Sequence, residues 1–539
     1  MSRNLDVETK AYSHAEEVEQ DVVFSEKAAV ADFKADAIEA ENAEHNMTVL
    51  QAVKAYPMAS FWAFVISCTI IMESYDVFLI GNFVALPAFY NRYGIFDQSL
   101  NDGAGGYVIE TKWQSALQVS GQLGALIGVF LAGPLTTVVG YRWATLIGLM
   151  ALNAFIFVFY YGDSLPVIFA AQLLEGLPWG IFIANAPAYC SEIVPIQLRA
   201  PATQMLQMFW AIGSIIVGAV TYRYNGVAGP SAYRVPIALQ WMFPTPLAIL
   251  IFFAPESPWW LVRKGRLDEA AKSIERLGRK SRITKSHETV AMMRRTIELE
   301  KSEKKPSHIE LFKGTDLRRT LIVCGVYAAQ NLTGNLIANQ AVYFFTQAGV
   351  GTKTAFALGL ITSALQMIFV MLSWILTTYF GRRSIYLWGS AVNTILLVAL
   401  GVAGSVGAST AAEYAQASLG LIVSVLFTLG PAPASWVIIG ETSAIRLRPL
   451  TTGIGRASYY IIEIPCIFLA SWMLNPTGAN LGGRCGYVWG ATGLFCLVVA
   501  YFELPEMKNR SYREIDIMFK RKIPARKWKK TPIDINDDE

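Results

Sequence analysis

The stretch PESPWWL, at residues 255–261, opens a polar segment that runs to residue 319 and divides the chain into two hydrophobic halves of similar length. Within this segment, residues 266–277 (RLDEAAKSIERL) place Leu267, Ile274 and Leu277 on one side of a predicted helix. Lys and Arg outnumber Asp and Glu over the whole segment, as is typical of the cytoplasmic loops of membrane proteins. The segment is therefore interpreted as a cytoplasmic linker whose amphipathic helices lie against a membrane-embedded bundle.

The composition indicates what the two halves are. Of the 539 residues, 53% are hydrophobic and only 16% are charged, whereas soluble domains carry about 25% charged residues. These values indicate a polytopic membrane protein. Basic residues of the linker and of the tail near residues 521–530 are attributed to neighbouring anionic lipid headgroups, so the lipid bilayer is an expected partner and nucleic acid is not.

No pattern for an enzyme accompanies this composition. The sequence has no nucleotide-binding loop and no metal-ligand spacing, its six cysteines are scattered, and its four histidines fall outside the apolar runs. We therefore expect a protein that is not an enzyme, with no metal site and no cofactor.

Apolar runs of about 20 residues, the length that crosses the hydrocarbon core of a bilayer, recur along both halves. Before the linker they lie at 61–83, 113–135, 143–161, 165–189, 203–222 and 235–253, and after it at 320–346, 355–379, 384–406, 414–440, 450–474 and 487–501. The expected fold class is an all-α polytopic membrane protein, with twelve transmembrane helices in two six-helix bundles.

The predicted organisation has five parts. They are an acidic N-terminal tail at 1–57, a six-helix bundle at 58–254, the linker at 255–319, a second six-helix bundle at 320–504 and a C-terminal tail at 505–539. Basic residues fall on alternate loops, which places both tails in the cytoplasm. The turns VGYR at 139–142 and FGRR at 380–383 both follow the second helix of a half, which indicates pseudo-symmetric halves. Folds with such repeats bind substrate near the bilayer midplane, between the halves.

Several motifs, in this order and at these spacings, resemble the sugar porter family of the major facilitator superfamily. They include PESP at 255–258, GRR at 381–383 and PEMKNRS at 505–511, within a match that spans about residues 60–519. Two further stretches, MESYD at 72–76 and LPWGIF at 177–182, resemble the fungal α-glucoside (maltose-type) permeases.

The resemblance implies a transport function. A secondary active transporter of this kind imports a sugar, in this branch an α-glucoside such as maltose, by proton symport with alternating access. It implies a monomer that crosses the plasma membrane many times, with both termini in the cytoplasm. Two alternatives remain open: a facilitative sugar uniporter of the same fold, and a porter-like sugar sensor.

The resemblance also implies a gate at the cytoplasmic end of the bundle. Its candidates are the charged residues of the short turns, namely Arg142, Glu192, Arg199, Glu256, Arg382, Arg383, Glu441, Arg446, Arg448 and Glu506. Such charges can hold the inner gate shut while the binding site faces outward; the alternative is that the arginines only set topology. The first half departs from the family pattern at Thr137 and Tyr141, so we expect a weaker network there.

Charged residues within the apolar runs are the candidates for proton coupling. Glu73 and Asp76 lie three residues apart and share a helix face, and intramembrane acids usually have a function. The resemblance places Asp76 at the proton site of symporting members. Arg456 and Glu463 lie seven residues apart on one face of the eleventh run, where pairing would lower the cost of both charges. The alternative for the two acids of the first run is a carboxyl pair at a hydrated helix end.

Two membrane positions depart from the family pattern. Gln122 stands where maltose-type permeases generally carry an acid, and Gln172 stands where many family members have an arginine. Glu463 is expected to supply the missing acid. Glu175, in the fourth run, is a similar acid without an assigned role.

Neutral polar residues in the seventh run are the candidates for sugar binding. Gln330, Asn331 and Asn335 offer both donors and acceptors, which suits hydroxyl-rich ligands at a lower desolvation cost than charges. The resemblance is to the sugar-binding Gln-Gln segment of the family. Trp436 is added because its ring could stack on a pyranose face. The alternative is that these polar residues form hydrogen bonds between helices.

Overall fold

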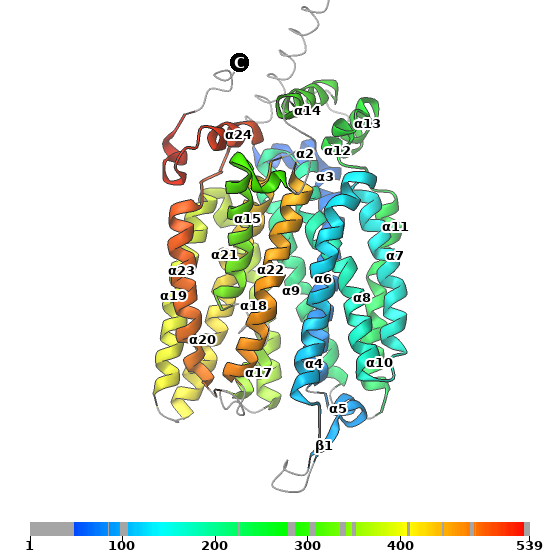
Figure 1. The fold of residues 1–539 in the computed structure, drawn as a ribbon, viewed down its shortest axis with the longest axis vertical. Coiled ribbons are helices and arrows are strands. Elements are labelled where there is room, and N and C mark those ends of the chain that lie inside the picture. The colour runs from blue at the N-terminus through cyan, green and yellow to red at the C-terminus, as the bar shows by residue number, and fades with distance from the viewer. Residues whose placement is uncertain are drawn as a thin grey trace, which may run out of the picture.

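The computed structural model describes most of the chain as a bundle of long, nearly parallel helices (Figure 1). The described residues are 48–84, 86–97, 106–224, 227, 229–278, 286–301, 309–334, 341–347, 352–406, 410–444, 447–474, 479 and 481–532.

The first half consists of helices and one small hairpin. Its helices are α2 (Val49–Ala55), α3 (Pro57–Ser67), α4 (Thr69–Val84), α5 (Pro87–Tyr93), α6 (Thr111–Val139), α7 (Tyr141–Tyr160), α8 (Leu165–Ile193), α9 (Ile196–Tyr224), α10 (Ser231–Ala238), η2 (Leu239–Met242) and α11 (Pro244–Phe252). Strands β1 (Ile95–Asp97) and β2 (Gly106–Val108) pair antiparallel, a hairpin that the apolar pattern did not predict.

The linker and the second half are helical as well. The linker carries α12 (Pro258–Arg263), α13 (Leu267–Leu277), α14 (Ser286–Lys301) and η3 (Glu310–Phe312). The second half contains α15 (Gly314–Leu332), α17 (Ala341–Gln347), α18 (Thr352–Tyr379), α19 (Arg382–Ser405), α20 (Thr410–Leu429), α21 (Pro431–Thr442), α22 (Arg448–Leu474), η4 (Gly482–Arg484) and α23 (Cys485–Glu503). The tail carries α24 (Tyr512–Lys520) and η5 (Ala525–Lys530).

Eleven of the described helical segments are long and apolar enough to cross a membrane, which confirms the expected all-α membrane fold. The predicted run at 320–346 is divided between α15 and α17, and residues 335–340 between them lie outside the described part of the chain. The predicted run at 414–440 is interrupted where Pro431 follows Gly430, since proline cannot donate the backbone hydrogen bond of a continuous helix. Apolar periodicity predicted each of these as one helix because it does not register a local break.

The two ends of the bundle differ in what covers them. Helices α12 to α14 and α24 lie across one end, and the β-hairpin lies at the other (Figure 1). We call these ends the linker face and the hairpin face. Helix α13 confirms the amphipathic helix predicted within residues 266–277, with Ile274 and Leu277 buried.

The two halves meet along α6 with α22 and along α9 with α18. Within the first half, α6 and α8 approach very closely: a Cβ atom added to Gly124 would lie 2.0 Å from the Leu173 carbonyl oxygen. Glycine permits this contact because it has no side chain, and small residues serve the same purpose at other membrane helix interfaces. The outer surface carries large apolar side chains such as Ile395 and Phe495, as a lipid-facing surface requires.

Candidate functional site

A cavity between the two halves holds most of the chemistry expected of a sugar site. Side chains of α4, α9, α15, α17, α18, α20, α21 and α22 line it. The lining residues are Phe78, Gln207, Trp210, Gln330, Ala341, Gly359, Thr362, Ser363, Gln366, Phe427, Thr428, Trp436, Arg456 and Tyr459. Amides, hydroxyls and aromatic rings predominate, and these groups bind sugars through hydrogen bonds and stacking.

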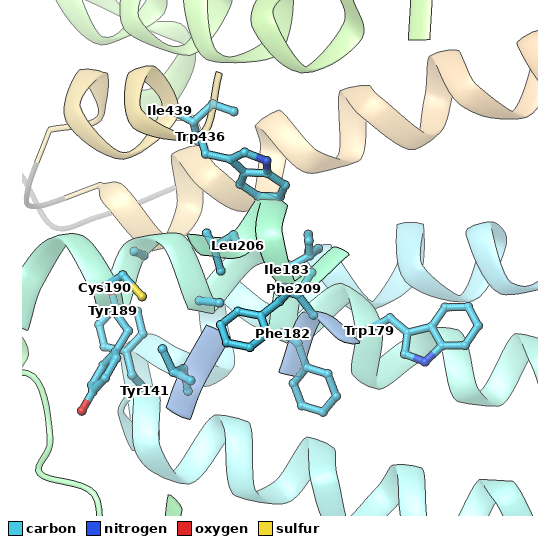
Figure 2. Packing of buried hydrophobic residues seen from close by; sticks show 14 of the residues in the cluster. Tyr141, Trp179, Phe182, Ile183, Tyr189, Cys190, Leu206, Phe209, Trp436 and Ile439 are labelled. Carbon is cyan, nitrogen blue, oxygen red and sulfur yellow. The ribbon is translucent and has the colours of Figure 1, made fainter. Parts of the chain in front are cut away.

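Trp436 connects the halves at this cavity. Its Nε1 donates a hydrogen bond to Gln207 Oε1 over 2.9 Å, from α21 of the second half to α9 of the first, and Figure 2 shows the ring beside α9. Another tryptophan, Trp179, lies apart from it in the packed interior of the first half (Figure 2). A Cβ atom added to Gly121 would be 2.4 Å from the Trp179 ring, so this side chain fills the α6–α8 contact and does not line the cavity.

The structure separates the three polar candidates of the seventh run. Gln330 lines the cavity, and its buried Nε2 has no hydrogen-bond partner. Asn331 is completely buried and its Nδ2 donates to the Tyr459 carbonyl oxygen over 3.2 Å, which ties α15 to α22. Asn335 lies outside the described residues.

Glu73 and Arg456 form a buried ion pair between the two halves. Arg456 Nη2 of α22 lies 2.8 Å from Glu73 Oε1 of α4, and both side chains are 2% exposed. Tyr460 donates its hydroxyl to the same oxygen over 2.7 Å. The Arg456 guanidinium also lies 3.8 Å from the centre of the Tyr459 ring. The cation at the cavity wall is therefore held by groups from both halves.

The expected pairing of Arg456 with Glu463 is not what the structure shows. Seven residues of helix correspond to a rise of about 10 Å, more than these side chains bridge when they also bind other partners. Instead, Tyr459 lies between them, donating its hydroxyl to Glu463 Oε1 over 3.2 Å.

Glu73 and Asp76 were expected to share a helix face, but their carboxylates have different partners. Three residues correspond to about 60° around a helix axis. That rotation turns Glu73 toward the second half and Asp76 into the first, where Gln240 of η2 donates its Nε2 to Asp76 Oδ1. The charged neighbour of Asp76 is Glu175 of α8.

Two glutamates at the linker face bind equivalent positions in the two halves. Glu256 accepts hydrogen bonds from the backbone nitrogens of Tyr141 (3.0 Å) and Arg142 (3.1 Å), at the start of α7. Glu506 accepts from the backbone nitrogen of Arg382 (2.9 Å), at the start of α19. Each carboxylate compensates unpaired N–H groups and the positive end of a helix dipole. Each half thus carries a carboxylate cap after its last membrane helix.

Burial changes the acidity of the first cap. Removal of Glu256 from water raises its pKa to about 7, although its backbone hydrogen bonds act in the opposite direction. An arginine beside each cap makes an equivalent hydrogen bond in the two halves. Arg383 donates to the Tyr501 carbonyl oxygen over 2.7 Å, and Arg142 donates to the Phe252 carbonyl oxygen.

Glu192 is the centre of a charge cluster in the first half. Arg263 of the linker lies 3.2 Å from its Oε1, and Arg448 of the second half lies 3.6 Å from the same atom. Tyr141 donates its hydroxyl to Glu192 over 3.1 Å, and Ser257 binds the other carboxylate oxygen. Arg263 therefore supplies a cation next to Tyr141, where the family pattern has an arginine.

A second cluster lies at the start of α19 and under the tail. Arg382 Nη2 lies 3.2 Å from Glu441 Oε1. The ring of Tyr512, from α24, lies between two guanidinium groups: Arg199 of the first half is 3.6 Å from its centre and Arg448 of the second half is 4.1 Å from it. The candidate Arg446 lies outside the described residues.

Sequence reasoning missed several of these residues. Gln207 lies three positions before Trp210 on α9, so it could have been assigned to the same helix face as that aromatic ring. The pattern SYRE at 511–514 is a helix capping box, which predicts the start of α24 and so the ordered position of Tyr512. Arg263 carries no comparable signal, because arginine is common throughout the linker.

The family described as "Sugar (and other) transporter" matches this chain over residues 62–519. The chain belongs to this sugar transporter family. It is 35% identical over 508 residues to the alpha-glucosides permease MPH3 of Saccharomyces cerevisiae. The aligned part covers 93% of this chain and 83% of that protein. The maltose permease MAL31 of the same organism is 36% identical over 507 residues, covering 93% and 82%.

Solved structures show the same fold. The proton:xylose symporter XylE, bound to 6-bromo-6-deoxy-D-glucose, superposes with a TM-score of 0.72 at 17% identity, covering 86% of this chain and 99% of that one. The expected major facilitator fold and the resemblance to maltose-type permeases are thereby confirmed. The protein is a multi-pass membrane transporter of the sugar transporter family, and members of this family are not enzymes.

Proposed function

We propose that this sugar transporter imports an α-glucoside, with maltose as the first candidate, by proton symport with alternating access. The linker face would be cytoplasmic, with both termini on that side, and the carrier would work as a monomer in the plasma membrane. Its partners would be the sugar and the surrounding lipid, and protons would be its only coupling agent.

The observation that carries this proposal is the ion pair between Glu73 and Arg456 at the wall of the central cavity. It is buried and it joins the two halves, so a relative movement of the halves changes the surroundings of both charges. Arg456 also lines the space in which a sugar would bind. Binding in the cavity and movement of the halves are therefore linked through shared groups, as a coupled carrier requires.

The choice of sugar is supported by similarity and by chemistry. The curated relatives at 35% and 36% identity carry the names alpha-glucosides permease and maltose permease. The cavity offers the amides of Gln207, Gln330 and Gln366 and the rings of Trp210 and Trp436, a suitable lining for a ligand with many hydroxyl groups.

The test is uptake in a host that lacks its own sugar transporters. Addition of maltose to unbuffered cells should make the medium more alkaline and should lead to accumulation of labelled maltose against its gradient. Competition by sucrose, trehalose and glucose would rank the substrates. Maltose entry without proton uptake would replace symport by uniport, and a response to maltose without entry would favour a sensor.

A further inference from the structure

We propose that the coupling proton is bound by a pair of carboxyl groups, Asp76 and Glu175, inside the first half, and that Glu175 is required for coupling. This inference rests on the proposed proton symport and names the site that would perform it. It also gives Glu73 a different role, as the acidic partner in the bridge between the halves.

The two carboxyl groups come from adjacent helices and interact electrostatically. Asp76 of α4 is 2% exposed and Glu175 of α8 is fully buried. Amides hold both: Gln240 donates to Asp76, and Gln172 Nε2 donates to Glu175 Oε2 over 3.1 Å.

Two acceptors beside the pair have no donor. Glu175 Oε1 and Gln240 Oε1 are both buried and have no hydrogen-bond partner. Buried polar atoms in folded proteins are almost always paired, because an unpaired group costs about 1–3 kcal/mol. A proton on either carboxyl group would add a donor among these acceptors, so the arrangement favours binding of one proton by the pair.

The surrounding charges favour the same state. In the described part of the chain, no lysine or arginine forms an ion pair with Asp76 or Glu175. The phenol of Tyr75 also interacts with Asp76, and its hydroxyl donates to the Pro236 carbonyl oxygen over 2.8 Å. Elements α3, α5, α6, α7, α9, α11, α12, α21, α22 and η2 also pack against α4 or α8, and none of their described charged groups forms an ion pair with the two acids. Two adjacent anions in an apolar interior repel strongly, and one proton removes that repulsion.

Glu73 differs from this pair in its charge balance. Its Oε2 also has no donor, but its charge is matched by Arg456 and its Oε1 accepts hydrogen bonds from Arg456 and Tyr460. The negative charge of an ionised Glu73 is therefore balanced by Arg456. Among the described residues, no such cation balances the charges of an ionised Asp76–Glu175 pair. The acid that sequence analysis expected Glu463 to supply is accordingly assigned to Glu175.

The step itself is a proton transfer and no other bond changes. The pair takes one proton from water while the site is open to the hairpin face, and returns it to water when the site is open to the linker face. Asp76 lines a narrow crevice with Gln240, Leu152 and Phe243, between α4, α7 and η2, where a proton path would run.

The test is a Glu175→Gln variant in transporter-deficient cells, with maltose as the probe. We expect maltose-driven alkalinisation and accumulation to disappear and the pH dependence of uptake to flatten, while counterflow of labelled maltose persists. Glu413→Gln, the same chemical change at the start of α20, should keep the parental ratio of protons to sugar. Glu73→Gln should lower transport while its residual uptake keeps that ratio.

Parental coupling in Glu175→Gln would overturn the inference and leave proton symport intact. Maltose entry without proton uptake in the parent protein would overturn both this inference and the proposed proton symport. A second measurement uses the unmodified carrier: a hydrophobic carbodiimide reacts with protonated carboxyl groups in apolar surroundings. Mass spectrometry should find the adduct on Asp76 or Glu175, and an adduct confined to Glu73 would contradict the assignment.

Discussion

Gln330 lines the central cavity, and its buried Nε2 is a hydrogen-bond donor without a partner. Replacing it by alanine removes that donor and leaves a sugar hydroxyl without a partner, a loss of about 1–3 kcal/mol. The apparent KM for maltose in Gln330→Ala should therefore rise by about fivefold to about a hundredfold, with an unchanged amount of carrier in the membrane. Initial uptake rates over a range of maltose concentrations measure this.

Asn331 provides the matched control for that experiment. It is a neighbour of the same chemical type, but its amide binds the Tyr459 backbone and does not line the cavity. Asn331→Ala should lower the amount of folded carrier and leave the KM nearly unchanged. An unchanged KM in Gln330→Ala would remove that residue from the sugar site.

At this scale, sequence could identify charged groups in the membrane but not their partners. Glu73 and Asp76 were expected to act together because helix geometry relates neighbours along one chain segment. The partner of Glu73 is Arg456, which lies 383 positions away. Only packing of the two halves determines such contacts, so no spacing rule within a helix could predict them.

At the scale of elements, Glu256 connects the end of α11 to the start of α7 and responds to pH. Its ordinary carboxyl pKa of 4.5 is raised to about 7 in the folded protein, mainly by burial. The folded state therefore binds a proton more tightly than the unfolded state. Its contribution to stability is complete below the ordinary pKa and is lost as the pH rises through about 7.

The thermal midpoint of the detergent-solubilised carrier should accordingly fall between about pH 5 and about pH 8, followed by tryptophan fluorescence. Glu256→Gln cannot ionise, so its midpoint should vary less with pH. Glu310→Gln, at the half-buried start of η3 in the linker, is the control and should retain the parental slope. A parental slope in Glu256→Gln would show that other groups cause the effect.

Elements were predictable where the apolar pattern is long and uninterrupted. The helices of residues 143–161 and 384–406 appear as α7 and α19, close to their expected bounds. Interrupted helices were predicted less well, although Pro431 and Pro244 in the sequence mark where two of the breaks occur. A proline of this kind either kinks or ends a helix, and packing decides which.

At the scale of the whole molecule, the tail helix α24 joins the halves at the linker face. Tyr512 contacts Arg199 and Arg448 from opposite halves, and its hydroxyl donates to the Ser191 carbonyl oxygen over 3.2 Å. Each cation–π contact contributes about 0.5–2 kcal/mol. Tyr512→Ala should therefore shift the carrier toward states that are open at the linker face.

The measurement is the labelling rate, from the linker face, of a cysteine introduced at Ser363 in the central cavity of a cysteine-free carrier. Tyr512→Ala should increase this rate several-fold. Tyr512→Phe keeps the stacked ring and loses only the hydroxyl, so its rate should stay near that of the parent. Equal rates in the parent, Tyr512→Ala and Tyr512→Phe would show that the tail does not stabilise closure of the linker face.

The division into halves and the membrane class followed from composition and from the linker, because both are properties of long stretches. The location of the cavity between the halves followed from the repeat. Its particular lining did not, since residues such as Gln207 and Gln366 lie in apolar runs where single polar residues most often pack between helices.

The matched caps have a consequence for the order in which the protein is made. Glu256 lies just beyond the last membrane helix of the first half, and Glu506 just beyond that of the second. Each ties the end of its half back to that half's third membrane helix. During synthesis, which proceeds from the N-terminus, the first half can therefore be completed before the second half has left the ribosome. Its end can then already be hydrogen-bonded to its third membrane helix through Glu256. The nascent chain would then hold a closed six-helix unit before α18 and α22 of the second half pack against it.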